Sequence, residues 1–240
     1  MKDLGELKFF LGIEFARSNK GILMSQRKYV LELISEIGLS GAKPVNTPME
    51  INQNLTTVEY DLSFNRGNAI ADEVLRDPGV YQRLVGKLLY LTMTRPDISF
   101  VVQVLSQFMH CPGISHMEAA SRVVWYIKQA PGLGLFMPAE DTKNLTAYCD
   151  SDWGACVETR RSLTGYLVKF GNALVFWKSK KQSPVSRSSA EAEFRSMASC
   201  AADVTWLIGL YAELGIKVCF PMKLVYDSKA AIDCCKSNLS

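Results

Sequence analysis

The order of hydrophobic and polar positions at the start of the chain predicts two strands and a helix. Residues 7–15 are rich in Phe and Ile and predict a strand, and residues 22–24 predict a second strand after a polar turn. Hydrophobic residues then recur every four positions from Tyr29 through Leu33, which is the spacing of an amphipathic helix. Gly38 stands where a helix C-cap is expected. The pattern therefore predicts a β-hairpin followed by a helix.

The middle of the chain divides into an irregular part and a helical part. Residues 41–78 have no sustained hydrophobic period, which favours a linker or a long surface loop. A helical pattern in about three pieces follows. These pieces are expected at residues 81–92, after Pro96 and from Ser115. Ser115 and Glu118 have the spacing of a capping box, and the Pro-Gly pair at 131–132 indicates a domain boundary.

Beyond this boundary the pattern alternates strands with helices and predicts an α/β fold. The expected elements are a strand at 145–150, a hairpin of 165–170 with 173–177, a helix from 189 to about 214, a strand at 223–227 and a helix at 229–235. The helix is expected to be either continuous or broken near Asp203.

Composition is that of a folded protein in a reducing compartment. Of the 240 residues, 48% are hydrophobic and 21% are charged, which is ordinary for a globular chain. The net charge of +3 permits a nucleic-acid partner without requiring one. The seven cysteines form no Cys-x-x-Cys pair, and with two histidines they offer no zinc site of the usual spacing. No signal peptide or membrane span is recognisable, so we expect a soluble intracellular protein without a membrane partner.

Three acidic residues stand at positions where side chains can converge on one edge of a sheet. Asp150 closes a predicted strand, Glu193 lies in the first turns of the long helix, and Asp227 ends another strand. Such carboxylates form a hard-oxygen site suited to Mg²⁺ or Mn²⁺. Two ions there could activate a water molecule and stabilise the leaving oxygen of a phosphodiester. The alternative is structural, because an isolated acid at a strand end or helix start is usually a turn former or a cap.

Glu193 is preferred over Glu191 because Glu191 already has a structural task. It lies three residues after Ser188, which is the capping-box spacing. Glu193 instead borders the apolar stripe expected along the helix and can lean toward the sheet. That stripe consists of Ala190, Phe194, Met197, Ala201, Val204 and Ile208. Asp152 and Asp203 are assigned to ordinary structural roles.

Several segments resemble copia-type LTR retrotransposon Pol polyproteins. Residues 1–14 (MKDLGELKFFLGIE) and 26–30 (QRKYV) resemble the end of the reverse transcriptase palm and the start of its thumb. Residues 81–91 (YQRLVGKLLYL) and 94–98 (TRPDI) are similar to the segment that joins polymerase to ribonuclease H. The segments that resemble the ribonuclease H domain are 148–153 (YCDSDW), 160–166 (RRSLTGY), 177–182 (WKSKKQ) and 188–193 (SSAEAE).

The resemblance implies a domain organisation. A hairpin and thumb start would occupy residues 1–50, a linker 51–80, and a helical connection 81–132. A C-terminally truncated ribonuclease H-like domain, with a mixed sheet and helices, would occupy residues 143–240. The polymerase's paired catalytic aspartates would lie before Met1 and a fourth metal-binding residue after Ser240, so we expect no polymerisation and weak or no nuclease activity.

The resemblance also implies an activity, namely metal-dependent hydrolysis of RNA in RNA–DNA hybrids during reverse transcription. Asp150, Glu193 and Asp227 follow the family's order of catalytic and metal-binding acids, whereas the related integrases end on a glutamate. Hybrids are recognised through 2′-hydroxyl and phosphate contacts. The candidate phosphate contacts are Lys178, Lys180, Lys181, Arg187, Arg160 and Arg161, although such residues often only solvate loops.

Other possibilities remain open at this stage. The chain could be a catalytically dead remnant or a nucleic-acid-binding module of a decayed element, or it could fail to fold stably alone. The expected partners are RNA–DNA hybrids or other nucleic acids and other Pol segments. The expected location is a cytoplasmic particle or the nucleus.

Overall fold

A computed structural model describes residues 5–39, 41–50, 53, 55–64, 72–140 and 142–226. The chain divides into two compact units, Met1–Phe136 and Met137–Ser240, which we call the N-terminal and C-terminal units. Across the described residues the fold is mixed α/β, with two four-stranded sheets and six α-helices. The α/β class expected from the sequence is confirmed at this level.

The N-terminal unit contains the first sheet. Its strands are β1 (Phe9–Phe10), β2 (Ile13–Ser18), β3 (Gly21–Ser25) and β4 (Gly134–Pro138), in that spatial order. The single strand predicted over residues 7–15 is therefore two strands, because Leu11 and Gly12 adopt positive φ angles of 48° and 74° that turn the chain back. β4 escaped the sequence analysis, since it directly follows the Pro-Gly pair that indicated a boundary.

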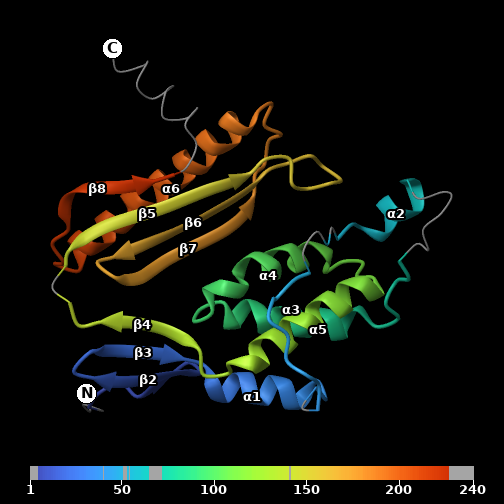
Figure 1. Cartoon of the computed structure of the whole chain (residues 1–240), viewed down its shortest axis with the longest axis horizontal. Coiled ribbons are helices and arrows are strands. Elements are labelled where there is room, and N and C mark those ends of the chain that lie inside the picture. Colours follow the sequence, from blue (N-terminus) through green and yellow to red (C-terminus); the bar gives the residue numbers. More distant parts are fainter. Residues whose placement is uncertain are drawn as a thin grey trace. The chain divides into compact units, whose positions relative to one another are not determined.

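Helices form the rest of the N-terminal unit. They are α1 (Arg27–Glu36), α2 (Val58–Phe64), α3 (Pro78–Leu91), α4 (Ser99–Leu105) and α5 (Ile114–Gln129), with short 3₁₀ turns at Pro96–Ile98 and Ser106–Phe108. α1, α3, α4 and α5 pack around one hydrophobic core (Figure 1). Fully buried members of this core include Val30, Leu88, Val102 and Val124. α2 lies within residues 41–78, where the sequence pattern favoured a linker or a long surface loop.

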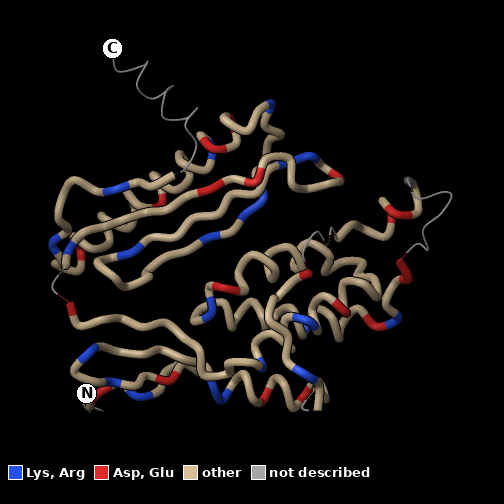
Figure 2. Tube along the Cα trace, viewed as in Figure 1, with Lys and Arg blue, Asp and Glu red and all other residues tan. Residues whose placement is uncertain are grey.

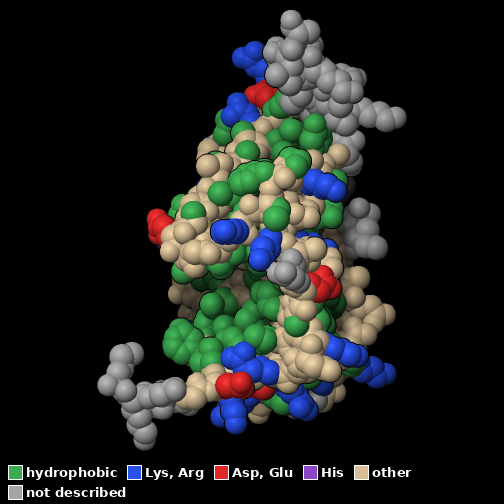
Figure 3. All heavy atoms as spheres, turned by 90° about the vertical axis from the view of Figure 1, so that its left-hand side faces the viewer, with side chains coloured by type: hydrophobic (Ala, Val, Ile, Leu, Met, Phe, Trp, Pro, Cys, Tyr) green, Lys and Arg blue, Asp and Glu red, His purple; other side chains and the backbone are tan. Residues whose placement is uncertain are grey.

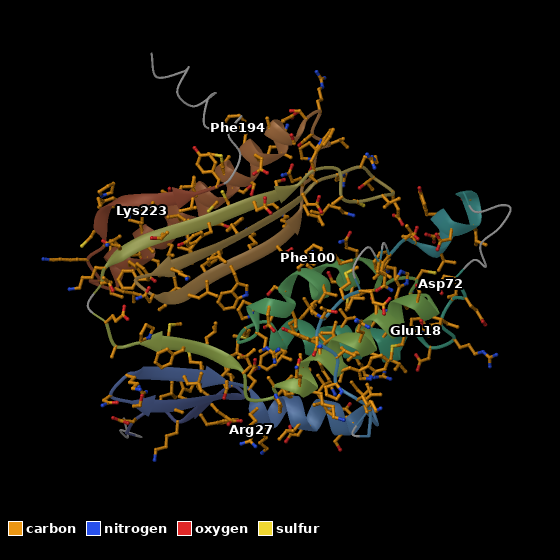
Figure 4. All side chains as sticks on the ribbon, viewed as in Figure 1. Arg27, Asp72, Phe100, Glu118, Phe194 and Lys223 are labelled. Atoms are coloured by element: carbon orange, nitrogen blue, oxygen red, sulfur yellow. The ribbon has the colours of Figure 1, made fainter. Side chains whose placement is uncertain are left out.

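Two of these helices begin where side chains satisfy their first backbone N–H groups. α3 starts three residues earlier than expected, because Asp77 accepts a hydrogen bond from the Gly79 N–H at 2.9 Å. The capping box predicted between Ser115 and Glu118 is wrong. Ser115 instead bonds Asp72, while Glu118 is exposed on α5 (Figure 4).

The C-terminal unit is a mixed sheet with one long helix. Its strands are β5 (Asn144–Asp152), β6 (Leu163–Phe170), β7 (Ala173–Lys181) and β8 (Cys219–Val225). They lie in the order β7-β6-β5-β8, with β8 parallel to β5 and the other neighbours antiparallel. α6 (Ser189–Glu213) runs along one face of this sheet without a break (Figure 1). The predicted hairpin is confirmed, and the predicted helix at 229–235 lies outside the described residues.

The face that α6 turns to the sheet differs from the predicted stripe. Its buried residues are Ala192, Glu193, Ser196, Cys200, Val204 and Leu207. Ala201 is exposed, while Phe194, labelled in Figure 4, and Met197 are only partly buried. Small side chains on the inner face let the helix approach the sheet closely, so the larger apolar residues lie at its flanks. Glu193 is thus part of the buried face instead of bordering it.

Several large hydrophobic side chains of the first sheet are exposed to solvent. Phe9, Phe10, Leu11 and Phe136 are all exposed by 46–66%. Hydrophobic side chains gather at the surface of this sheet in the space-filling view (Figure 3). The core of the C-terminal unit, in contrast, is formed by residues such as Leu145, Ala147, Cys200 and Val204.

Candidate functional site

Asp150 lies near the C-terminal end of β5 with its side chain exposed. Leu145, Ala147 and Cys149 of this strand are buried in the core with α6. Because side chains alternate along a strand, Asp150 points away from that core. One of its carboxylate oxygens accepts a hydrogen bond from the Ser151 N–H at 2.8 Å. The carboxylate is therefore accessible and held by the backbone N–H of the next residue.

Glu193 lies on α6 with only 7% of its surface exposed. Three residues later on the same helix, the Ser196 hydroxyl donates a hydrogen bond of 2.8 Å to the backbone carbonyl of Asp150. Residues three apart on a helix share a face. The turn of α6 that carries Glu193 is therefore fixed against the part of β5 that carries Asp150.

Asp227, the third predicted acid, lies outside the described residues. The strand before it, β8, is parallel to β5, and Tyr148 pairs with Val225. These partners are two residues before Asp150 and two residues before Asp227. Within the described part of the chain, no group of three or more His, Cys, Asp or Glu side chains is arranged to hold a metal ion.

The other acids near this region have structural roles. Ser188 caps α6 by accepting a hydrogen bond from the Glu191 N–H at 3.2 Å, and Glu191 accepts one from the Arg187 N–H at 2.8 Å. Asp203 accepts hydrogen bonds from Lys178, at 2.8 Å, and from the Tyr166 hydroxyl. Asp152 pairs with Leu163 in the sheet and is exposed.

Several of the predicted basic residues gather around one pocket between β7 and α6. Lys178, Lys180 and Lys181 reach it from β7, and Figure 2 shows Lys and Arg positions at the C-terminal end of that strand. Arg195 and Ser199 reach it from α6. The cavity has a volume of about 350 Å³.

Arg160, Arg161 and Arg187 lie elsewhere. Arg160 and Arg161 belong to the loop between β5 and β6, which backbone hydrogen bonds close at Cys156. Arg187 lies just before α6. None of these three arginines lines the pocket, so the six predicted phosphate contacts fall into separate groups.

Asp203 contacts two of the residues that line the pocket, Lys178 and Tyr166. Burial acts to raise the pKa of this carboxyl, but hydrogen bonds from Lys178 and Tyr166 outweigh it and hold the pKa below its ordinary value. The same contact adds to burial in raising the pKa of the Tyr166 hydroxyl. Lys178 is thus partly neutralised, whereas Lys180 has no ion pair with any acid that the structure describes.

The chain is similar in sequence to several known proteins. Residues 1–51 match the family described as reverse transcriptase (RNA-dependent DNA polymerase). The chain is 40% identical over 235 residues to the retrovirus-related Pol polyprotein from transposon RE1 of Arabidopsis thaliana, which covers 98% of this chain and 15% of that protein. A similar protein from transposon TNT 1-94 of Nicotiana tabacum is 33% identical over 249 residues, covering 100% of this chain and 18% of that protein.

A third relative is of comparable length to this chain. It is an uncharacterized mitochondrial protein of Arabidopsis thaliana, 38% identical over 208 residues, covering 86% of this chain and 80% of that protein. The chain belongs to the copia-type retrotransposon Pol polyprotein family. This Pol segment spans about 15% of the length of the RE1 polyprotein. No solved structure matches it.

Two side chains that matter in this Pol segment were missed from the sequence, and both lie on α6. Ser196 anchors α6 to Asp150, and Arg195 joins the basic pocket. Helical periodicity could have grouped Arg195 with Ser199 and Asp203, which follow it at intervals of four residues. No sequence signal shows which strand that face meets.

Among the described residues, no helix is both long and apolar enough to cross a membrane.

Proposed function

We propose that the C-terminal unit of this Pol segment is a ribonuclease H-like hydrolase that cleaves the RNA strand of RNA–DNA hybrids. Its catalytic, metal-binding acids would be Asp150, Glu193 and Asp227. The observation that carries the proposal is the 2.8 Å hydrogen bond from the Ser196 hydroxyl to the Asp150 carbonyl. It supports a shared site because it ties the turn of α6 that contains Glu193 to the end of β5 that contains Asp150.

The pairing of β5 with β8 supports the choice of the third acid. Tyr148 pairs with Val225 in a parallel register. A continuation of that register by two residues would bring position 227 beside Asp150. Side chains at paired positions of neighbouring strands point to the same face of a sheet. The proposal therefore predicts that Asp227 acts together with Asp150.

The donor groups fit Mg²⁺ or Mn²⁺, because carboxylate oxygens are the hard ligands that these ions prefer. Burying an ionisable group such as Glu193 costs free energy, and a bound cation would offset that cost. When bound, such ions stabilise charge that develops on a phosphodiester. The protein's own role is to position these acids. β5 presents Asp150 to solvent, and α6 holds Glu193 in place through packing.

Cleavage of a labelled RNA–DNA hybrid in Mg²⁺ or Mn²⁺ tests the proposal. The wild-type chain should release RNA fragments, and Asp150→Asn, Glu193→Gln and Asp227→Asn should each lower the rate by about a hundredfold or more. Glu213→Gln is the matched control, since Glu213 is an exposed acid at the end of the same helix. Its rate should equal that of the wild type.

The alternative from the sequence makes a different prediction in the same assay. A nucleic-acid-binding remnant would bind the hybrid equally well with and without Asp150→Asn. It would also cleave no faster than that variant. If the wild-type chain cleaves the hybrid no faster than the Asp150→Asn variant, the hydrolase proposal is ruled out.

A further inference from the structure

Gln182 is the first residue after β7, and its side chain is buried between the sheet and the start of α6. Only 8% of the residue is exposed. Its backbone N–H donates a hydrogen bond of 2.8 Å to the Ser162 carbonyl, which extends the antiparallel pairing of β6 with β7 by one residue. The sheet therefore holds the backbone of Gln182, and the side chain starts from a fixed position.

The side-chain amide nitrogen of Gln182 donates hydrogen bonds to a strand and to the helix. Its acceptors are the Thr164 hydroxyl on β6 and the Ala192 carbonyl on α6, each at 2.9 Å. The Ser151 hydroxyl on β5 lies 3.4 Å from the same nitrogen. Because an amide nitrogen carries two N–H groups, the two shorter bonds use both of them, and the contact with Ser151 is weaker.

The amide oxygen of Gln182 also has a partner, which fixes the orientation of the amide. It accepts a hydrogen bond of 3.1 Å from the hydroxyl of Ser186, which is itself buried. A flipped amide would turn this oxygen toward the Ala192 carbonyl, so that two acceptors would face each other. The Ser186 carbonyl in turn accepts a hydrogen bond of 3.0 Å from the Trp153 indole N–H. The buried amide thus has one favourable arrangement among these partners.

The contacts of Gln182 lie beside both of the proposed acids that the structure describes. Ala192 directly precedes Glu193 on α6, and Ser151 directly follows Asp150 on β5. Three residues after Glu193, the Ser196 hydroxyl donates to the Asp150 carbonyl at 2.8 Å. The turn that carries Glu193 is therefore bonded to the sheet on both sides of this acid.

We propose that Gln182 is a positioning residue for Glu193, and that it sets the affinity of the acidic site for a divalent cation. This inference rests on the proposed function, because it concerns the same acids. Gln182 acts through the backbone of α6, since it bonds the carbonyl of the residue before Glu193. Residues that orient metal ligands in this way change metal affinity by about tenfold or more when they are replaced.

Binding of Mn²⁺ to the full chain without nucleic acid tests this role. Mn²⁺ broadens the NMR signals of nuclei near it, so the backbone amides of Asp150 and Glu193 should broaden during a titration. Gln182→Met keeps a side chain of similar length but has no amide. The Mn²⁺ concentration that gives half-maximal broadening should be about tenfold higher in this variant.

Cleavage of the labelled hybrid provides a second measurement on the same variant. The Mg²⁺ concentration for half-maximal rate should also rise about tenfold in Gln182→Met. The KM for the hybrid should stay within about twofold of the wild-type value, because Gln182 acts on the metal site and leaves ground-state binding of the hybrid unchanged.

Val204→Ala is the matched control for stability. Val204 is buried in the core of the same unit and lies on α6, roughly 16 Å along the helix from Glu193. Its truncation should lower the melting temperature by leaving a cavity, while the contacts of Gln182 remain. Mn²⁺ affinity and the Mg²⁺ dependence of cleavage should equal those of the wild type. Equal losses of Mn²⁺ affinity in Val204→Ala and Gln182→Met would overturn the inference.

Ser186→Ala decides the question if Gln182→Met does not fold. It removes only the hydroxyl that holds the amide oxygen, so Gln182 can still reach Thr164 and Ala192. Mn²⁺ affinity should fall by about threefold, in the same direction as in Gln182→Met. Unchanged Mn²⁺ affinity in folded Gln182→Met, or in Ser186→Ala where Gln182→Met is unfolded, would overturn the inference.

Metal binding separates this inference from the proposed function. Asp150→Asn should weaken the Mn²⁺-dependent broadening at Glu193, which shows that the ion binds between these acids. Wild-type protein that binds Mn²⁺ at these residues but does not cleave the hybrid would refute the proposed function alone. Wild-type protein that cleaves, with an equal Mg²⁺ dependence in Gln182→Met, would refute the positioning role alone.

Discussion

Arg95 is almost completely buried, and its guanidinium group is bound on several sides. Asp97 accepts hydrogen bonds from its Nε and Nη2 at 2.9 and 2.7 Å, the Ala130 carbonyl accepts one at 3.2 Å, and the ring of Tyr126 lies beside it. Through the hydrogen bond to the Ala130 carbonyl, the Arg95–Asp97 ion pair connects the turn at Pro96–Ile98 to the end of α5. A buried charge of this kind is tolerated only while its partners remain in place.

Replacing the acid of this pair should therefore be costly. Asp97→Asn keeps the shape but removes the charge that faces Arg95, and we expect a loss of about 3 kcal/mol in the free energy of unfolding. Urea denaturation measures it. Glu118→Gln, which removes an exposed acid of the same unit, should change stability by less than about 0.5 kcal/mol. Similar losses in both variants would show that the pair contributes little.

The same pair predicts how stability depends on pH. Burial acts to raise the pKa of Asp97, but Arg95 outweighs it and the net pKa is lowered. A carboxyl with a depressed pKa stabilises the fold fully above its ordinary pKa and loses that contribution as the pH falls through the folded value. Wild-type stability should therefore decline between about pH 5 and pH 3 more steeply than that of Asp97→Asn. Parallel curves would contradict this account.

Cys156 offers a test of local electrostatics in the C-terminal unit. Burial acts to raise the pKa of its thiol, but hydrogen bonds from Thr159 and the charge of Lys181 lower it overall. Cys149 and Cys200 are buried, and the pKa of Cys200 is raised by its hydrogen bond to Cys149 and by burial. Only the thiolate reacts with iodoacetamide. Cys156 should be alkylated before Cys149 and Cys200 at pH 7, and Lys181→Gln should slow its alkylation, as followed by mass spectrometry of peptides.

Elements far apart in the sequence meet where a residue lets their backbones approach. β4 joins the first sheet beside β3, more than a hundred residues after it. A Cβ atom at Gly134 would lie 2.1 Å from the Met24 carbonyl oxygen, so only glycine fits there. At Gly132 the nearest atom to a Cβ would be the Cδ of Arg27 at 3.6 Å, which is an ordinary contact.

Substitution at these two glycines should separate strand docking from general effects on the loop. Gly134→Ala should displace β4 and increase amide hydrogen exchange in both β3 and β4. Gly132→Ala should leave those amides protected. Protection of β4 that is unchanged in Gly134→Ala would show that the strand does not depend on this close approach.

At the scale of the whole molecule, each unit has a hydrophobic core of its own. The N-terminal core is formed between helices, and the C-terminal core between α6 and the second sheet. Leu88 is fully buried in the first core, whereas its neighbour Leu89 is 38% exposed. The helical period of the sequence distinguishes these two leucines, because Leu88 lies on the same side of the predicted helix as Leu84 and Leu91, which are also buried.

A cavity in one core should act first on that unit. Leu88→Ala should lower the stability of the N-terminal unit by about 2–5 kcal/mol, as measured by native-state hydrogen exchange, and Leu89→Ala should lower it much less. Amides of β5 and β6 should keep their exchange free energies in both variants. A matching loss in β5 and β6 would mean that the two units unfold together.

Local patterns determined much of this protein. Alternation and turn residues predicted the hairpin of β6 and β7, and the Ser188–Glu191 spacing predicted the start of α6, because both depend on neighbours in the chain. The sequence motifs also identified the family. The sequence likewise proposed Asp150, Glu193 and Asp227, which remain predictions.

Only the tertiary structure decided which faces meet. The buried stripe of α6 was misplaced from the sequence, since packing against a sheet selects small residues such as Ala192, Ser196 and Cys200 over larger apolar ones. The start of α5 was misplaced because Gly113 donates to the ring of His116 and Ser115 bonds Asp72, a residue more than forty positions away. The basic pocket exists only because residues of β7 and α6, which are apart in the sequence, line one cavity. Hydrogen bonding and side-chain period act along the chain and can be read from it, whereas close packing acts between segments whose proximity the chain alone does not reveal.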